Sequence, residues 1–157
     1  MQKELYLRIL DQFPNPIWRS GLDAKCDYFN SAWLAFTGRK IEEEMGDGWV
    51  KGVHPDDLNP CVKTYLDSFK ARKPFEMEYR LKHNDGTYHW LLDSGSPFFD
   101  DSNNFMGYIG SCYDINEVKK HMTEIEEMNR YMTDRELKMV KMKKQITDLE
   151  NKLNQQK

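Results

Sequence analysis

One group of side chains in this sequence has the residue types and spacing of a metal site. His54, Asp56 and Asp57 are near neighbours, and an imidazole with two carboxylates is a ligand set that zinc accepts. Pro55 stands between them, however, and proline favours the first position of a helix, where acidic residues also stabilise the positive end of the helix dipole. Helix initiation explains the motif, so we expect no metal site there.

The other histidines give no catalytic arrangement either. His83 and His89 flank a predicted hairpin, where we expect them to be exposed, and His121 lies on a predicted long helix. No spacing pairs a nucleophile with a base, and no glycine-rich loop of the phosphate-binding type occurs. We therefore expect this chain not to be an enzyme, and any kinase or cyclase activity to lie in a further domain of a longer protein.

Length and charge limit the classes of function. About 40 of the 157 residues belong to the long helix, and the rest suffice for one domain with its own core. The net charge of -3 without a dense basic patch argues against nucleic-acid binding. No apolar run is long enough to span a bilayer and no signal peptide is visible. Cys26, Cys61 and Cys112 form neither a disulfide framework nor a zinc pattern, which favours a cytoplasmic location.

The hydrophobic periodicity predicts a mixed α+β order. Strict alternation from Phe75 to Lys82 is typical of a half-buried strand, and Asn84-Asp85-Gly86 is a hairpin turn. Pro60 is expected to interrupt or restart the helix that begins at Pro55. We predict helices over residues 2–13, 31–37, 41–45, 55–71 and 115–157, and strands over residues 17–20, 25–29, 75–82, 87–99 and 105–113.

The C-terminal helix has the periodicity of a coiled coil. Apolar residues recur at alternating intervals of three and four, and mainly charged or amide side chains lie between them. This stripe is narrower than the face that a helix presents to a globular core, so we expect a parallel homodimer. The alternative is a helix that folds back on its own domain or stays single and solvated. His121 and Arg135 interrupt the stripe, and its apolar members, the predicted seam, are Val118, Ile125, Met128, Met132, Met139, Met142, Ile146, Leu149 and Leu153.

Several short motifs occur in a fixed order along the chain. They are Asn30-Ser31-Ala32-Trp33, Phe36-Thr37-Gly38, Gly48-Trp49, His54-Pro55-Asp56-Asp57, Glu78-Tyr79-Arg80-Leu81, Asn84-Asp85-Gly86, Tyr88-His89-Trp90, and Gly107 to Gly110 leading into Asp114-Ile115-Asn116. Their order and spacing resemble the PAS family, most closely the PAS domains of bacterial sensor kinases. The likeness covers about residues 5–116, and Asn116 stands where the family more often has threonine. Residues 135–146 also resemble the signalling helix that joins PAS domains to effector domains.

The resemblance implies an α+β fold, with a five-stranded antiparallel sheet, short helices on one face and a long C-terminal coiled-coil helix. The domain boundaries would then be an N-terminal amphipathic helix over residues 1–13, a PAS domain over 14–116 and a coiled-coil signalling helix over 117–157. PAS domains commonly enclose a pocket between the sheet and the short helices. Alternation together with the likeness places twelve side chains there: Trp33, Phe36, Val62, Leu66, Phe69, Met77, Tyr79, Leu81, Trp90, Leu92, Tyr108 and Cys112.

The pocket prediction leaves two interpretations open, because the same side chains are large enough to fill the core completely. No cofactor is predicted, although an unidentified small ligand is possible. The resemblance leads us to expect no flavin, because residues 46–53 lack the cysteine of the flavin-binding light sensors of this family. We also expect no haem, because haem sensors of the family usually supply a histidine from the helix over residues 55–71, which contains none. Cys61 and Cys112 are better read as small hydrophobic residues than as iron ligands.

Two functions follow from these expectations. The first is a sensory and signal-relay module of a larger protein, which we expect to be a histidine kinase of a bacterial two-component system. A ligand or partner event in the core would reach a downstream effector through the coiled coil. The second is a dimerisation or scaffolding module without a ligand. Both predict a homodimer.

Overall fold

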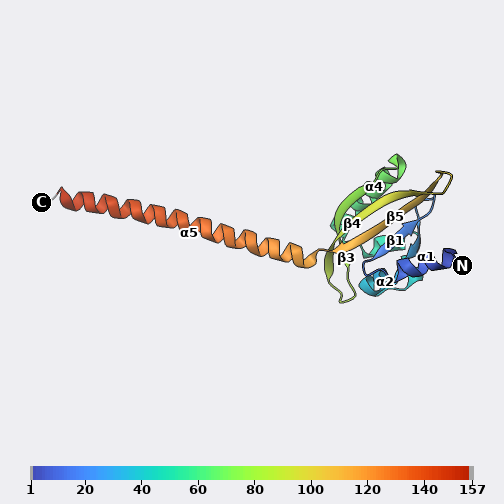
Figure 1. The fold of residues 1–157 in the computed structure, drawn as a ribbon. Helices are drawn as coiled ribbons and strands as arrows, with labels where there is room; N and C mark the ends of the chain where they lie inside the picture. Colours follow the sequence, from blue (N-terminus) through green and yellow to red (C-terminus); the bar gives the residue numbers. More distant parts are fainter. Residues whose placement is uncertain (1, 156–157) are drawn as a thin grey trace. The chain divides into compact units, whose positions relative to one another are not determined.

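Five antiparallel strands form the sheet that organises the first part of the chain (Figure 1). The computed structural model describes residues 2–155, with side-chain exposure from residue 5 onward. The strand order is β2-β1-β5-β4-β3, so that the last strand in the sequence lies in the middle of the sheet. The bounds are β1 Ile17–Ser20, β2 Cys26–Phe29, β3 Phe75–Lys82, β4 Tyr88–Phe99 and β5 Phe105–Asp114. The predicted five-stranded antiparallel sheet is confirmed.

Short helices precede and connect the strands. Asn30 caps the helix after β2, because its Oδ1 accepts hydrogen bonds from the Trp33 amide (3.0 Å) and the Ile17 amide (2.8 Å). The same side chain therefore begins the helix and ties it to the first strand. The helices are α1 Gln2–Asp11, α2 Ser31–Thr37, α3 Ile41–Glu44, the 3-10 helix η1 Gly48–Gly52, and α4 Pro55–Ala71.

Helix α4 begins as predicted but is not interrupted. Pro55 occupies its first turn, His54 is the N-cap, and the His54 Nδ1 accepts a hydrogen bond from the Asp56 amide at 3.2 Å. The predicted break at Pro60 is wrong, because α4 continues through it. Proline removes only one backbone hydrogen bond at this position, and burial of the Tyr65 side chain further along holds the helix against the sheet.

Helix α5 spans Asn116–Asn154. The contacts within the chain divide the chain into two units, and the boundary follows Asn116. The predicted long C-terminal helix is confirmed; residues 156 and 157 of the predicted range lie outside the described residues. None of the α5 side chains that the structure describes is buried, so the predicted seam is exposed in a single chain. Among residues 2–155, no helix combines the length and the apolar character needed to cross a membrane.

Candidate functional site

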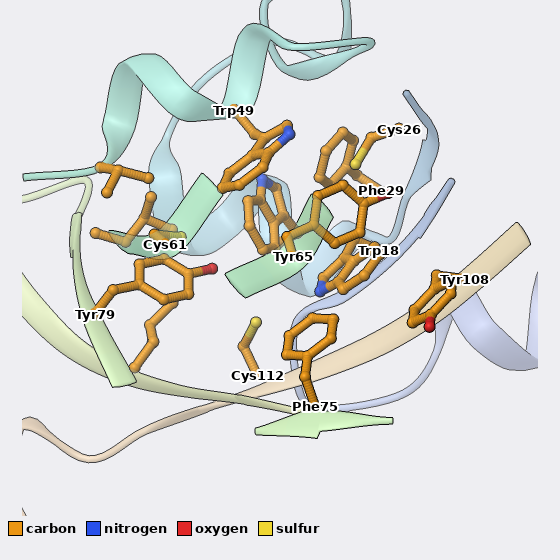
Figure 2. Packing of buried hydrophobic residues seen from close by; sticks show 14 residues of the cluster. Trp18, Cys26, Phe29, Trp49, Cys61, Tyr65, Phe75, Tyr79, Tyr108 and Cys112 are labelled. Atoms are coloured by element: carbon orange, nitrogen blue, oxygen red, sulfur yellow. The ribbon is translucent and has the colours of Figure 1, made fainter. Parts of the chain in front are cut away.

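A cluster of aromatic rings forms the core of the unit that ends at Asn116, and Trp18 of β1 is one of its members (Figure 2). The Tyr65 ring of α4 meets the Trp18 indole edge-on, with ring centroids 5.6 Å apart. The Phe75 ring of β3 stacks on the indole at 6.1 Å, nearly parallel to it, and also contacts the Tyr65 ring. Such edge-to-face and stacked contacts add to the gain from burying the rings. The Trp18 indole of β1 thus contacts a ring of the edge strand β3 and a ring of helix α4.

Two glycines make room for this indole. Gly110 of β5 is the register partner of Trp18 on one side and of Gly95 of β4 on the other. A Cβ at Gly110 would lie 2.3 Å from the Trp18 ring, and a Cβ at Gly95 would lie 2.4 Å from the Phe75 ring. Because real Cβ atoms do not approach other atoms so closely, the stacked rings lie directly on a strip of bare backbone.

Asp93 places a carboxyl group inside this aromatic cluster. It is only 3% exposed, and it accepts hydrogen bonds from the Trp18 Nε1–H at 2.9 Å and from the Tyr79 hydroxyl at 3.2 Å. Burial raises the pKa of Asp93 to about 6, although the hydrogen bond from Trp18 favours the ionised form. Cys112 of β5 is its register partner, and burial raises the pKa of that thiol well above its usual value. The core therefore contains a polar group that can bind a donor or a cation.

The pH dependence of stability tests the Asp93 environment. Asp93 ionises near pH 4 in an unfolded chain but only near pH 6 in the folded one, so the folded state binds more protons between these values. The stabilisation that results from this raised pKa is complete below about pH 4 and is lost as the pH rises through about 6. The free energy of unfolding falls by about 3 kcal/mol over this range. We expect Asp93→Asn to remove this change, measured as the difference in free energy of urea unfolding between the two proteins from pH 4 to pH 8. A difference that stays constant over this range would contradict the raised pKa.

A small cavity lies beside Trp18 and Asp93. Its free volume is ≈ 10 Å³, which is about the room for one water molecule. Of the twelve residues predicted to face a pocket, Trp33 and Met77 contribute to its wall. The complete lining is Trp18, Cys26, Phe29, Trp33, Trp49, Tyr65, Phe75, Met77 and Asp93.

Most of the other predicted pocket residues belong to the surrounding core. Those that are buried are Trp33, Tyr79, Leu81, Tyr108 and Cys112. Those that are partly buried against the same cluster are Phe36, Phe69 and Met77. The core therefore takes up these side chains largely by packing them against one another.

The predicted facing of strand β4 is wrong. Trp90 pairs with Arg80, and Leu92 pairs with Glu78, on the face of the sheet opposite to the core. The Arg80 guanidinium lies over the Trp90 ring at 5.2 Å, which explains how a tryptophan is accommodated there. The β4 residues that face inward are instead Leu91, Asp93 and Gly95, and the last of these has no side chain.

The predicted facing of helix α4 is also wrong by one residue. Cys61 and Tyr65 are buried, whereas Val62 is only partly buried and Leu66 is 37% exposed. Positions four apart share a helix face, so the inward stripe is the one that contains the tyrosine. The Tyr65 hydroxyl donates a hydrogen bond to the Ser20 Oγ at 2.7 Å, and this bond satisfies the polar end of a buried ring.

The His54-Pro55-Asp56-Asp57 motif, which was considered as a metal site, has a structural role. Arg80 donates to both oxygens of Asp57, at 2.7 and 2.8 Å, and these hydrogen bonds lower the pKa of that carboxyl group. Asp57 therefore ties α4 to β3. For haem, the thiol of Cys61 is a poor candidate ligand, because burial raises its pKa to about 12 and a ligand must be a thiolate.

Comparison with known proteins places this geometry in a family. The sequence model of the family described as the PAS fold matches residues 27–112. The chain is 33% identical over 144 residues to an uncharacterised protein of Sinorhizobium fredii, which covers 92% of the chain and 17% of that protein. It is 28% identical over 126 residues to sporulation kinase C of Bacillus subtilis, covering 78% of the chain and 28% of the kinase. The chain thus spans less than a third of the length of either relative.

Solved structures show the same fold. The PAS domain of BvgS from Bordetella pertussis has a TM-score of 0.59 at 20% identity, covering 83% of this chain and 98% of that domain. The N-terminal domain of a diguanylate cyclase with a PAS/PAC sensor from Marinobacter aquaeolei has a TM-score of 0.59 at 24% identity, covering 66% of this chain and 97% of that one.

Proposed function

The chain belongs to the PAS family, and we propose that it relays a signal from its core, through a parallel coiled coil, to the effector domain of a larger protein. The observation that carries the proposal is the way in which the central strand ends. Strand β5 runs to Asp114, and α5 begins at Asn116. A conformational change in the central strand would therefore pass directly along the backbone to the start of the helix.

Hydrogen bonds join this connection to β4. The Ile115 amide donates to the Trp90 carbonyl at 2.9 Å, and the Asn116 amide donates to the Asp114 Oδ1 at 2.9 Å. On β4, Asp93 lies three residues from Trp90 and lines the cavity. A ligand that altered the hydrogen bonds of Asp93 would shift β4, and with it the acceptor of the Ile115 amide. The relay needs two states of comparable energy that the ligand distinguishes.

The seam of α5 supports the dimeric part of the proposal. Its apolar side chains are all exposed in the single chain, for example Ile125 at 58% and Leu149 at 59%. Pairing two such stripes would bury them, and methionine at several seam positions can repack at low cost when the register or the crossing angle changes. The homodimer would use the complete predicted seam.

The relatives support a kinase effector. Sporulation kinase C of Bacillus subtilis and the peroxide stress-activated histidine kinase mak1 of Schizosaccharomyces pombe are much longer than their match with this chain. We infer that a histidine kinase of a bacterial two-component system is the downstream effector, and that the module works in the cytoplasm.

A second function is favoured by the size of the cavity. A free volume of ≈ 10 Å³ admits no organic ligand unless the aromatic side chains move apart. A PAS domain with so full a core would serve as a ligand-free dimerisation module, in which α5 holds two chains together.

A thermal-shift screen of residues 1–157 separates the two functions. A small molecule that enters the cavity is expected to raise the melting temperature saturably, on the order of 10 °C at a hundredfold excess over its Kd. Met77→Trp, which fills the cavity, should remove the shift. Trp90→Phe on the opposite face should retain it.

The outcomes of the screen differ for the two functions. A shift that survives in a folded Met77→Trp protein would contradict binding at this cavity. If no compound gives a saturable shift and no small molecule co-purifies with the protein, the ligand-free function is the correct one.

A further inference from the structure

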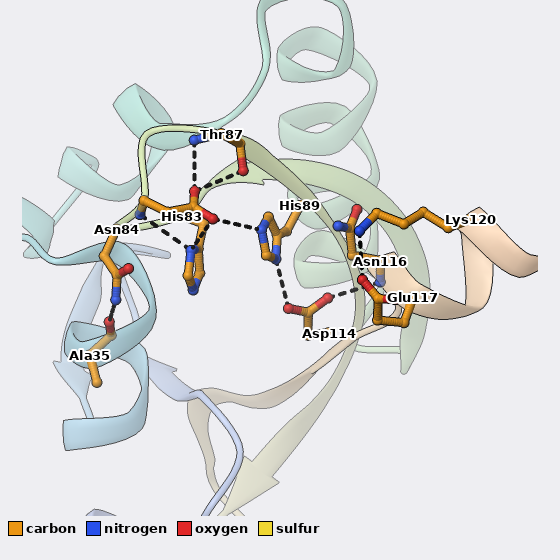
Figure 3. Close-up of polar contacts among 10 residues, drawn as sticks. Ala35, His83, Asn84, Thr87, His89, Asp114, Asn116, Glu117 and Lys120 are labelled. Atoms are coloured by element: carbon orange, nitrogen blue, oxygen red, sulfur yellow. Dashed lines mark hydrogen bonds and ion pairs between the residues drawn. The ribbon is translucent and has the colours of Figure 1, made fainter.

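The hairpin between β3 and β4 brings together two histidines and a carboxylate (Figure 3). The Asp85 Oδ2 lies 3.2 Å from the His83 Nδ1 and 3.4 Å from the His89 Nε2. The expectation that both histidines are exposed is wrong, because their side chains are 24% and 17% exposed and their rings stack with centroids 4.2 Å apart. These three ligand atoms lie within 4.8 Å of one another.

In the neutral rings, each of these three atoms is an electron-pair donor. The His83 Nδ1 uses its lone pair to accept a hydrogen bond from the Asp85 amide at 3.3 Å, and a metal ion at this nitrogen would replace that bond. The His89 Nδ1 faces the Asp114 Oδ2 at 2.8 Å; donation of its proton there leaves the lone pair of the neutral ring on Nε2, facing Asp85. Two imidazole nitrogens and a carboxylate oxygen thus lie within 4.8 Å of one another, and a cation bound among them would bring their electron pairs to one point once a ring turns.

The carboxylate is held in place for this role. Its Oδ1 accepts hydrogen bonds from the Thr87 amide at 2.8 Å and from the Thr87 Oγ1 at 2.7 Å. These bonds hold the pKa of Asp85 well below its usual range, so that the group is ionised at neutral pH. Because Oδ1 is occupied, Oδ2 is the oxygen that remains directed at the histidines.

We propose that His83, Asp85 and His89 bind a divalent first-row transition metal ion such as Zn²⁺. Two imidazoles and one carboxylate are a common three-residue ligand set for zinc, and water completes the coordination. Asp114 would orient His89 at the metal by accepting a hydrogen bond from the other ring nitrogen, Nδ1, as carboxylates do for many metal-bound histidines. The site lies away from the cavity beside Trp18 and does not depend on the proposed relay.

Helix α2 packs against the hairpin and its two imidazole rings. Phe36 of α2 meets both imidazoles edge-on, at 4.8 Å from His83 and 5.8 Å from His89. The Asn84 amide donates to the Phe36 carbonyl at 2.8 Å, and its side chain donates to the Ala35 carbonyl at 2.6 Å. Asn84 thereby anchors the turn to α2 through two hydrogen bonds.

Binding requires one ring to turn. The stacked imidazoles are within 11° of parallel, whereas an ion must lie close to the plane of each ring that coordinates it. His89 is held by Asp114, so His83 is the ring expected to rotate about its Cβ–Cγ bond. Nuclear magnetic resonance should show the largest changes on Zn²⁺ addition in the His83 ring and in the Phe36 ring packed against it.

Calorimetric titration of residues 1–157 with Zn²⁺ tests the site, with Co²⁺ absorption reporting on the ligands. We expect one ion per chain. His83→Gln and His89→Gln should each weaken binding by about tenfold or more, and Asp114→Asn by about 10–100-fold while the Co²⁺ spectrum keeps its form. His121→Gln is the matched control, because this exposed histidine of α5 lies outside the site and its loss should change nothing.

Two results would overturn the proposal. One is the absence of Zn²⁺ binding at millimolar concentration; the other is binding that is equally strong in His83→Gln, His89→Gln and the parent chain. Urea unfolding without metal checks that the variants are folded, and His83→Gln preserves the test should loss of the His89–Asp114 bond destabilise the domain. Neither result bears on the cavity or on α5, so failure here leaves the relay proposal intact.

Discussion

Replacing Ile125 and Ile146 together with lysine is expected to convert the proposed homodimer into a monomer while leaving the PAS domain folded. Each isoleucine buried in a coiled-coil seam contributes about 1.5–3 kcal/mol, and a dimer loses four of them. The loss of at least about 6 kcal/mol raises the dissociation constant by more than about 10⁴-fold. Sedimentation velocity at tens of micromolar (on the order that keeps a coiled-coil dimer assembled) measures the change, and circular dichroism checks the fold.

The chain offers a matched control for this experiment. Leu137 and Val140 are exposed to a similar degree in the single chain, 55% and 64% against 58% and 53% for the two isoleucines, but lie off the predicted seam. The double replacement of Leu137 and Val140 with lysine should therefore leave the dimer assembled. If both variants dissociate equally, the predicted seam lies on the wrong face of the helix. A parent chain that sediments as a monomer would contradict the proposed homodimer itself.

Gly110→Ala is expected to destabilise the PAS domain by about 3 kcal/mol or more, as for other overpacked core positions. The added Cβ would lie 2.3 Å from the Trp18 indole, which would have to move. Its movement would break the 2.9 Å hydrogen bond to Asp93 and leave a buried carboxyl group with one partner fewer. Urea denaturation followed by tryptophan fluorescence measures the loss.

Gly21→Ala is the control for the glycine prediction. A Cβ at Gly21 would meet its nearest neighbour at 3.5 Å, an ordinary van der Waals distance. We expect a change within about 0.5 kcal/mol, as for most surface substitutions. A Gly110→Ala protein as stable as Gly21→Ala would mean that the indole does not occupy the place described.

Periodicity and turn chemistry predicted the order of the α-helices and strands, but not the short 3-10 helix η1. The alternation from Phe75 to Lys82 and the Asn84-Asp85-Gly86 turn predicted the β3–β4 hairpin, because pleat and turn act over a few residues. The predicted break at Pro60 was wrong because proline preferences describe only the local backbone. The burial of Tyr65, which stabilises α4 beyond this residue, is a tertiary contact. Strand and helix identity thus followed from local rules.

The facing of residues in β4 and α4 required tertiary information. Hydrophobicity alone points Trp90 inward, but its ring lies under the Arg80 guanidinium on the other face, and the inward position is taken by an aspartate. A buried carboxyl group gives no hydrophobic signal, and its partner Trp18 is distant in sequence. The convergence of His83 and His89 was missed for a similar reason: their spacing has a meaning only once the hairpin register is known.

The central position of β5 has a consequence for how the protein is made. Strands β1 and β2 form one hairpin and β3 and β4 another, and only β5 pairs with both, through β1 and β4. A nascent chain that has not yet delivered residues 105–114 holds two separate hairpins with unfilled edges, which are open to pairing with other chains. Closure of the domain therefore awaits nearly complete translation of its sheet, immediately before α5 leaves the ribosome.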